Sequence, residues 1–266
     1  MIIDAHGHAC SGYATLESLL NELNKNKIEK VILFPAEIGK DKIDKIPDFK
    51  SKNILYFSNV IGKFLTRFFD LSQKIDFGNS YVYYLKLLAP QRIIQFYQLT
   101  PKYLYKMKSD FEKMKYSGIK LHQCVKYFSI NSDFFNCVID FAEEKELPIV
   151  IHLSGRKDAL DIIEVAKKRN IKIIIAHLLF YKLFVNSWDS IKDNIYFDLA
   201  NYYFVNKDSI NKAIKYFGCN KLIFGTDNPF GANAISKTID MINNLQVTPK
   251  EKEMIFSGNI QEILKM

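Results

Sequence analysis

The sequence of 266 residues contains little cysteine and little arginine. Its four cysteines show no CxxC spacing, and in a chain of this length they are expected to be free buried thiols rather than a disulfide framework. Only four of the 37 cationic residues are arginines, and the lysines are scattered along the chain. We therefore attribute the net charge of +8 to biased composition and do not expect nucleic acid to be the partner.

Long apolar runs are also missing. None reaches the roughly 18 residues that a membrane span needs, and the most apolar stretch, 171–180, contains Lys172 and His177. The first ten residues, MIIDAHGHAC, have no basic segment of the kind that opens a secretory signal. With 48% apolar residues the chain can still bury a large core, so we expect a cytoplasmic globular protein without a membrane segment.

Short apolar, β-branched runs recur at regular intervals. Most are nearly continuous rather than alternating, as in strands covered on both faces; they occupy residues 2–8, 31–34, 92–97, 118–122, 149–152, 171–177, 195–199 and 222–227. Six of the seven steps between successive run ends are 22 to 30 residues, the length of one strand and helix, and helical patterns at 134–145 and 158–169 lie between runs. This pattern predicts an α/β fold, a single-domain (β/α)8 TIM barrel over residues 1–266, with a doubly wound open sheet as the alternative.

One step is much longer than the others. Residues 38–90 carry more chain than one loop and helix need, and the segment is rich in aromatic residues. We interpret it as a helical insertion between the second and third strands that forms a lid over the carboxyl end of the barrel. A hairpin packed on the side of the barrel and part of a homodimer interface are the alternatives.

All five histidines lie at the carboxyl ends of predicted strands: His6, His8, His122, His152 and His177. Barrel active sites form at this end, so residues far apart in the sequence should meet there. His6 and His8 are two residues apart on one strand and therefore share a face. Asp227 ends the last strand, and three imidazoles with one carboxylate suit a divalent ion that keeps room for a water molecule.

Several motifs resemble those of the amidohydrolase superfamily, in particular its branch of small metal-dependent hydrolases and aminocarboxymuconate-semialdehyde-type decarboxylases. They span almost the whole chain: IIDAHGH at 2–8, GIKLHQ at 118–123, PIVIHLSG at 148–155, IIIAH at 173–177, LIFGTDNPF at 222–230 and the tail IFSGNIQEIL at 255–264. The resemblance implies that His6, His8 and His152 bind a metal ion and that Asp227 is both a ligand and a proton shuttle. His177 would polarise the substrate or orient the attacking water.

The same resemblance leaves the role of the fourth strand open. Lys120 and His122 share a face of that strand. A carboxylated Lys120 would bridge two metals, a buried Lys120 would pair with Asp4 or Asp198, and a substrate contact is the third alternative. His122 is expected to contact substrate or a second metal. Asp4 is expected to lie behind the ligands and to hold a ligating histidine in one tautomer. We expect one Zn²⁺ ion, with Mn²⁺ or Fe²⁺ as alternatives and a second metal left open.

Three further residues are predicted to contact a small-molecule substrate. Arg156 follows the fifth strand and could clamp a carboxylate or phosphate, or lie solvated in a loop; Asn201 and Asn228 follow the seventh and eighth strands. The leading functional prediction is a metal-dependent hydrolase of an ester, lactone or amide, and the alternative is a metal-dependent decarboxylase. A barrel-type deoxyribonuclease is disfavoured because His122 stands where those enzymes carry a glutamate. A binding barrel without catalysis is the remaining alternative.

Overall fold

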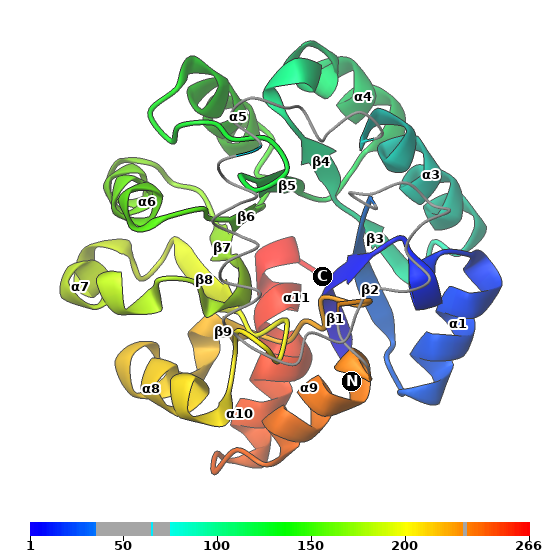
Figure 1. Ribbon diagram of the computed structural model, residues 1–266, viewed down its shortest axis with the longest axis vertical. Coiled ribbons are helices and arrows are strands. Elements are labelled where there is room, and N and C mark those ends of the chain that lie inside the picture. Colours follow the sequence, from blue (N-terminus) through cyan, green and yellow to red (C-terminus); the bar gives the residue numbers. More distant parts are fainter. Residues whose placement is uncertain (36–64, 66–74, 231–232) are drawn as a thin grey trace.

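The computed structural model describes residues 1–35, 65, 75–230 and 233–266. Within them, parallel strands and helices alternate around a ring (Figure 1). The strands are β1 Ile3–His8, β2 Lys30–Phe34, β3 Ile93–Gln95, β4 Tyr97–Leu99, β5 Ile119–His122, β6 Ile149–His152, β7 Ile173–Ile175, β8 Ile195–Asp198 and β9 Leu222–Ile223. The α-helices are α1 Leu16–Lys25, α3 Ile75–Leu88, α4 Met107–Met114, α5 Asp133–Glu144, α6 Arg156–Lys168, α7 Trp188–Ile191, α8 Lys207–Phe217, α9 Ala234–Asn243, α10 Pro249–Glu253 and α11 Asn259–Leu264.

The strands form two hydrogen-bonded sheets, β1-β2-β3 and β4-β5-β6-β7-β8-β9, which join at both ends. β3 and β4 are one strand interrupted at Phe96, where hydrogen bonding passes from β2 to β5. At the other end, the Ala5 amide donates to Phe224 O over 3.1 Å, and Gly7 bridges Asn228 in parallel. The ring therefore closes as the expected eight-stranded barrel, and the open-sheet alternative does not apply.

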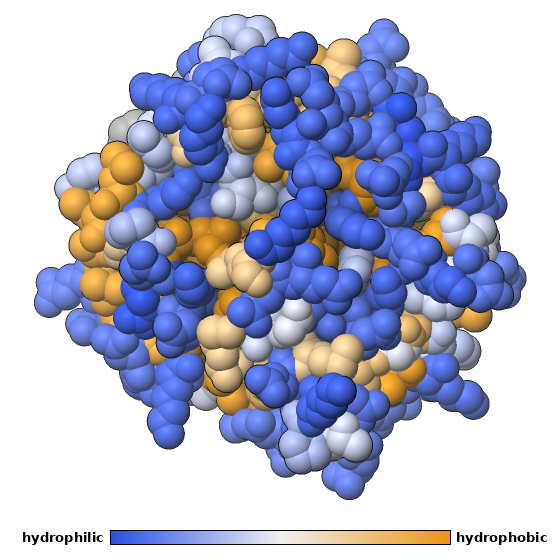
Figure 2. Space-filling view, turned by 180° about the vertical axis from the view of Figure 1, so that it is seen from behind, coloured by the Kyte–Doolittle hydropathy of each residue, from blue (hydrophilic) through white to orange (hydrophobic). Residues whose placement is uncertain are grey.

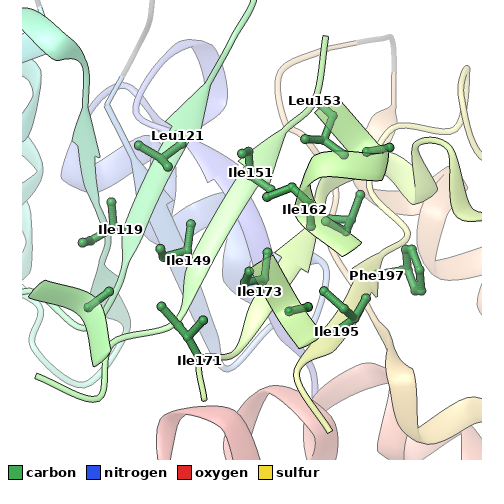
Figure 3. Packing of buried hydrophobic residues seen from close by; sticks show 14 of the residues in the cluster. Ile119, Leu121, Ile149, Ile151, Leu153, Ile162, Ile171, Ile173, Ile195 and Phe197 are labelled. Carbon is green, nitrogen blue, oxygen red and sulfur yellow. The ribbon is translucent and has the colours of Figure 1, made fainter. Parts of the chain in front are cut away.

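The apolar runs form strands because both of their faces are covered. On the outer face, isoleucines at matching positions of β5, β6, β7 and β8 stand side by side, and Ile162 of α6 packs nearby (Figure 3). This row consists of Ile119, Ile149, Ile173 and Ile195, all fully buried. Branched side chains pack well on a pleated surface, which explains why these runs are so rich in isoleucine.

The inner face is apolar at one end of the barrel only. Ile32, Val150 and Ile174 belong to the interior cluster, and Ile260 and Ile263 of α11 pack against it. The side-chain amide of Asn259 fastens α11 to the start of β9 by donating to Cys219 O and Leu222 O over 2.8 and 2.7 Å. α11, which lies within the tail motif 255–264, therefore plugs the end opposite the histidines.

Helix starts follow the local sequence. Thr15 caps α1 by a reciprocal pair of hydrogen bonds with Ser18, and Asn206 caps α8 in the same way with Ser209. Such caps satisfy amide groups that a helix leaves without partners in its first turn. None of the helices in the described part of the chain is long and apolar enough to cross a membrane.

Part of the predicted insertion belongs to the regular barrel. α3 packs against the β2–β3 side of the ring, where Val82 and Leu85 join the same cluster as Val31 and Ile93. The insertion predicted over 38–90 therefore extends too far at its carboxyl end, because residues 75–88 form the helix that a βα unit requires. Most of the rest of the segment 38–90, which was predicted to form the lid, lies outside the described residues.

The face seen in Figure 2 is mainly hydrophilic, with apolar side chains in several small groups. Scattered apolar groups of this kind are ordinary on protein surfaces.

Candidate metal centre

The structure brings all five histidines together at one end of the barrel. Adjacent ring centroids lie 5.4 Å apart for His6 and His8, 4.8 Å for His6 and His177, and 4.9 Å for His152 and His177. His122 stacks on His152 at 4.1 Å. All lie at strand ends or directly after them, as the sequence pattern predicts.

Contacts at Nδ1 define the tautomers of His6 and His8. His6 Nδ1 lies 2.8 Å from Asp198 Oδ2, and His8 Nδ1 lies 3.2 Å from the Pro35 carbonyl oxygen. Carboxylate and carbonyl oxygens only accept, so each Nδ1 carries the proton and each Nε2 keeps its lone pair. Both Nε2 atoms lie 3.4 Å from Asp227 Oδ1, so three potential ligand atoms converge on one point.

The carboxylate of Asp227 is fixed by a hydrogen bond and kept ionised by its neighbours. Its Oδ2 accepts a hydrogen bond from Asn201 Nδ2 over 2.8 Å. Burial alone would raise the pKa of the Asp227 carboxyl, but the neighbouring imidazoles, chiefly that of His177, outweigh burial and lower the pKa below its ordinary value. The carboxylate is therefore ionised at neutral pH and available to a cation.

Several residues at this end adopt a left-handed backbone, and three of them belong to the centre itself. The φ angles are 56° at His177, 66° at Asn201 and 56° at Asp227. Conformations of this kind cost roughly 1–3 kcal/mol each, and they concentrate at functional sites because the surrounding structure must enforce them.

The backbone at Gly225 passes close to the side chain of His6. A Cβ on Gly225 would lie 2.8 Å from His6 Cβ, so this position requires glycine.

His152 is buried, and neither ring nitrogen has a hydrogen-bond partner among the described residues. Burial lowers the pKa of His6, His122 and His152 well below the ordinary value, so these imidazoles are neutral at neutral pH. Burying a neutral imidazole without a hydrogen-bond partner costs free energy, unless a ligand or a metal ion contacts its ring nitrogens.

These residues fit a divalent transition-metal ion. The candidate ligand atoms of His6, His8 and Asp227 lie within 4.8 Å of one another. A second group, formed by His6, His177 and Asp198, meets the same limit, but the Asp198 oxygens already accept from His6 Nδ1 and the His177 amide. Nitrogen with carboxylate oxygen is the ligand mixture that zinc, manganese and iron share.

Asp4 differs from its predicted role. Its carboxylate accepts from the Thr226 amide and hydroxyl over 2.9 and 2.7 Å, from Tyr13 OH and from the His6 backbone amide. A register shift between Asp4 and Gly7 breaks the alternation along β1, so Asp4 does not share the face of the histidine rings. Asp4 thus ties β1 to the segment before Asp227.

The carboxylate that fixes a histidine tautomer is Asp198, which the sequence reasoning placed only as a lysine partner. Its Oδ1 also accepts the amides of His177 and Ala200 over 2.7 and 3.1 Å. The available signal was its position at the end of a strand, the same signal that singled out Asp227. Lys120 lies in the same centre, with Nζ 3.0 Å from His6 Nε2.

Arg156 and His177 line a common cavity of about 410 Å³ beside the centre. The Arg156 side chain is exposed, and the walls are mostly apolar: Leu178, Leu179, Phe180, Leu183 and Phe204. Asn201 and Asn228 also lie at this end. The Asn201 amide nitrogen is committed to Asp227, whereas Asn228 Nδ2 is buried without a partner among the described residues.

The sequence reasoning did not consider Thr100. Leu99 pairs with Leu121, so Thr100 is the next residue along, beside His122. Its side chain is buried, and its hydroxyl has no partner among the described residues. A lone threonine at a strand end carries no distinctive sequence signal.

The sequence matches no protein-family model and no curated relative. Solved structures match over the whole chain. An amidohydrolase II is 14% identical with a TM-score of 0.70 and covers 100% of both chains. An Acinetobacter baumannii protein described as a probable 2-pyrone-4,6-dicarboxylic acid hydrolase is 13% identical (TM-score 0.70; 100% of this chain and 99% of that one). A dihydroxybenzoic acid decarboxylase from Polaromonas with bound manganese is 13% identical (TM-score 0.67; 99% and 96%).

This chain has the amidohydrolase fold. The resemblance that the motifs carry is therefore confirmed for the architecture, and the neighbours include enzymes of more than one reaction type.

Proposed function

We propose that the protein is a metal-dependent hydrolase of a small-molecule ester, lactone or amide. The observation that carries the proposal is the convergence of His6 Nε2 and His8 Nε2 on Asp227 Oδ1, each over 3.4 Å. Buried His152, whose ring nitrogens have no hydrogen-bond partner among the described residues, would supply a fourth ligand. A divalent ion held by these four residues would act as a Lewis acid and lower the pKa of water from 15.7 to about 7.

The remaining chemistry falls to His177 and Asp227. His177 Nδ1 lies 3.2 Å from the Ala200 carbonyl oxygen and donates to it. Nε2 is then the nitrogen that would orient the attacking water or polarise the scissile carbonyl group. Asp227, whose Oδ2 is fixed by Asn201, takes the proton of that water and passes it to the leaving oxygen or nitrogen as the scissile bond breaks.

Decarboxylation is the second candidate, and the cavity beside His177 favours it. Arg156 and Lys182 supply positive charge to a cavity whose walls are mostly apolar. A carboxylate on an apolar body would fit such a cavity. His177 and Asp227 would then position the acid, and Asp227 would first take a proton from water and then deliver it to the carbon atom that loses carbon dioxide.

Paired assays test the proposal. Metal-stripped protein is reconstituted with Zn²⁺ or Mn²⁺ and assayed for hydrolysis of an ester, lactone and amide panel, and for CO₂ release from aromatic and unsaturated acids. Hydrolysis that is lost in Asp227→Asn supports the first candidate, and CO₂ release without hydrolysis supports the second. Metal binding without turnover in either assay would contradict both and favour a binding barrel.

A further inference from the structure

Lys120 lies inside the barrel, within the candidate metal centre. It is fully buried on β5, where it pairs with Gln98 on one side and Val150 on the other. Its Nζ lies 3.0 Å from His6 Nε2 and 4.6 Å from the centroid of the Phe34 ring. A buried amine in this place is unexpected in a cation site, because it competes with the cation for the same electron pair.

The direction of the Lys120–His6 hydrogen bond follows from the rest of the imidazole. His6 Nδ1 gives its proton to Asp198, so Nε2 has one lone pair and accepts from the Lys120 amine. A zinc ion would use that same lone pair, at about 2.0–2.1 Å from the nitrogen. The hydrogen bond and metal coordination at His6 are therefore mutually exclusive.

We propose that Lys120 is an internal competitor for the metal at His6. The lysine holds His6 Nε2 in the metal-free protein, and it must leave that atom whenever a metal ion binds. Lys120 thereby sets the metal affinity and keeps the buried imidazole satisfied while no ion is present. This proposal rests on the proposed metal centre, and it adds a residue that tunes the occupancy of that centre.

Two effects act in the same direction when the amine is removed. The metal no longer has to break a buried hydrogen bond, and it no longer shares a site of low dielectric constant with a nearby cationic group. Hydrogen bonds to charged groups contribute enough that their loss corresponds to an affinity change of about ten- to a hundredfold. Lys120→Met, which preserves length and apolar volume but cannot donate, should therefore bind metal more tightly than the wild type.

A zinc titration tests the inference. Metal-stripped wild type, Lys120→Met and Lys221→Met compete for Zn²⁺ with a chromophoric chelator at one fixed pH. Lys221 is the matched control, because it is also buried but stacks 4.3 Å from the Tyr196 ring and lies outside the histidine cluster. The expected result is about ten- to hundredfold tighter zinc binding in Lys120→Met and no change in Lys221→Met.

Equal or weaker zinc binding by Lys120→Met overturns the proposal while leaving the metal centre intact. Absence of zinc binding by the wild type and by both lysine variants contradicts the proposed metal centre itself. Thermal unfolding of the metal-free proteins shows whether each variant is folded. Lys120→Leu, which also lacks a donor, repeats the comparison if Lys120→Met cannot be recovered in folded form.

Discussion

Replacement of Asp198 by asparagine changes one atom and should weaken metal binding about 10- to 100-fold, the usual consequence of altering a residue that orients a ligand. Asp198 Oδ1 accepts two backbone amides, and Oδ2 accepts the His6 Nδ1 proton over 2.8 Å. In Asp198→Asn the amide oxygen keeps the two backbone bonds, so the NH₂ group faces His6. The ring must then move its proton to Nε2, which removes the lone pair that the metal needs.

The assay is the same zinc competition titration, with Asp189→Asn as the control. Asp189 is fully exposed on α7, so its substitution makes the same chemical change away from the centre. Because the alternative tautomer preserves a hydrogen bond at Nδ1, the metal-free Asp198→Asn protein should remain folded. Wild-type zinc affinity in Asp198→Asn would refute the tautomer argument.

Three further predictions concern stability. Asn201→Ala should lower the unfolding free energy, measured by urea titration, by about 2 kcal/mol, because it loses the hydrogen bond to Asp227 and places an alanine in a left-handed backbone. Asn201→Gly loses only the hydrogen bond, so it should lower the unfolding free energy by about 1 kcal/mol in the same assay. Ile263→Ala should cost about 2–4 kcal/mol in the same assay, and a loss under 1 kcal/mol would show that α11 does not plug the barrel. Burial raises the pKa of Tyr196 to about 12, so above its ordinary value of 10 the unfolded chain ionises first and stability falls until about pH 12. Tyr196→Phe should remove this part of the pH dependence, and an identical alkaline profile would contradict it.

The barrel was predictable because strands that are buried on both faces have nearly continuous apolar sequences. Runs such as 149–152 and 195–199 are apolar for that reason, and their spacing sets the topology. The convergence of the histidines follows from the topology alone. Their position at strand ends is visible in the sequence, and parallel strands of a barrel open onto one mouth.

The predictions that differ from the structure do so for local physical reasons. Asp4 does not hold a histidine tautomer as predicted, because a register shift in β1 interrupts the period-two alternation, and the residues between Asp4 and Gly7 give no sign of that shift. Lys120 was expected to pair with a carboxylate, bridge two metals or contact substrate, whereas its Nζ lies 3.0 Å from His6 Nε2, a contact that only the three-dimensional register reveals. The region 38–90 was treated as one insertion because helical patterns do not show whether a helix packs on the barrel or over it.

Metal content per chain is the most direct test of the central claim. Protein purified without a chelating column or metal-binding tag is reconstituted with Zn²⁺, desalted and analysed by elemental analysis, alongside His6→Ala/His8→Ala. The account predicts about one zinc ion per wild-type chain and almost none in the double variant. Wild-type protein that retains no metal after reconstitution, or a double variant that retains as much as the wild type, would contradict it.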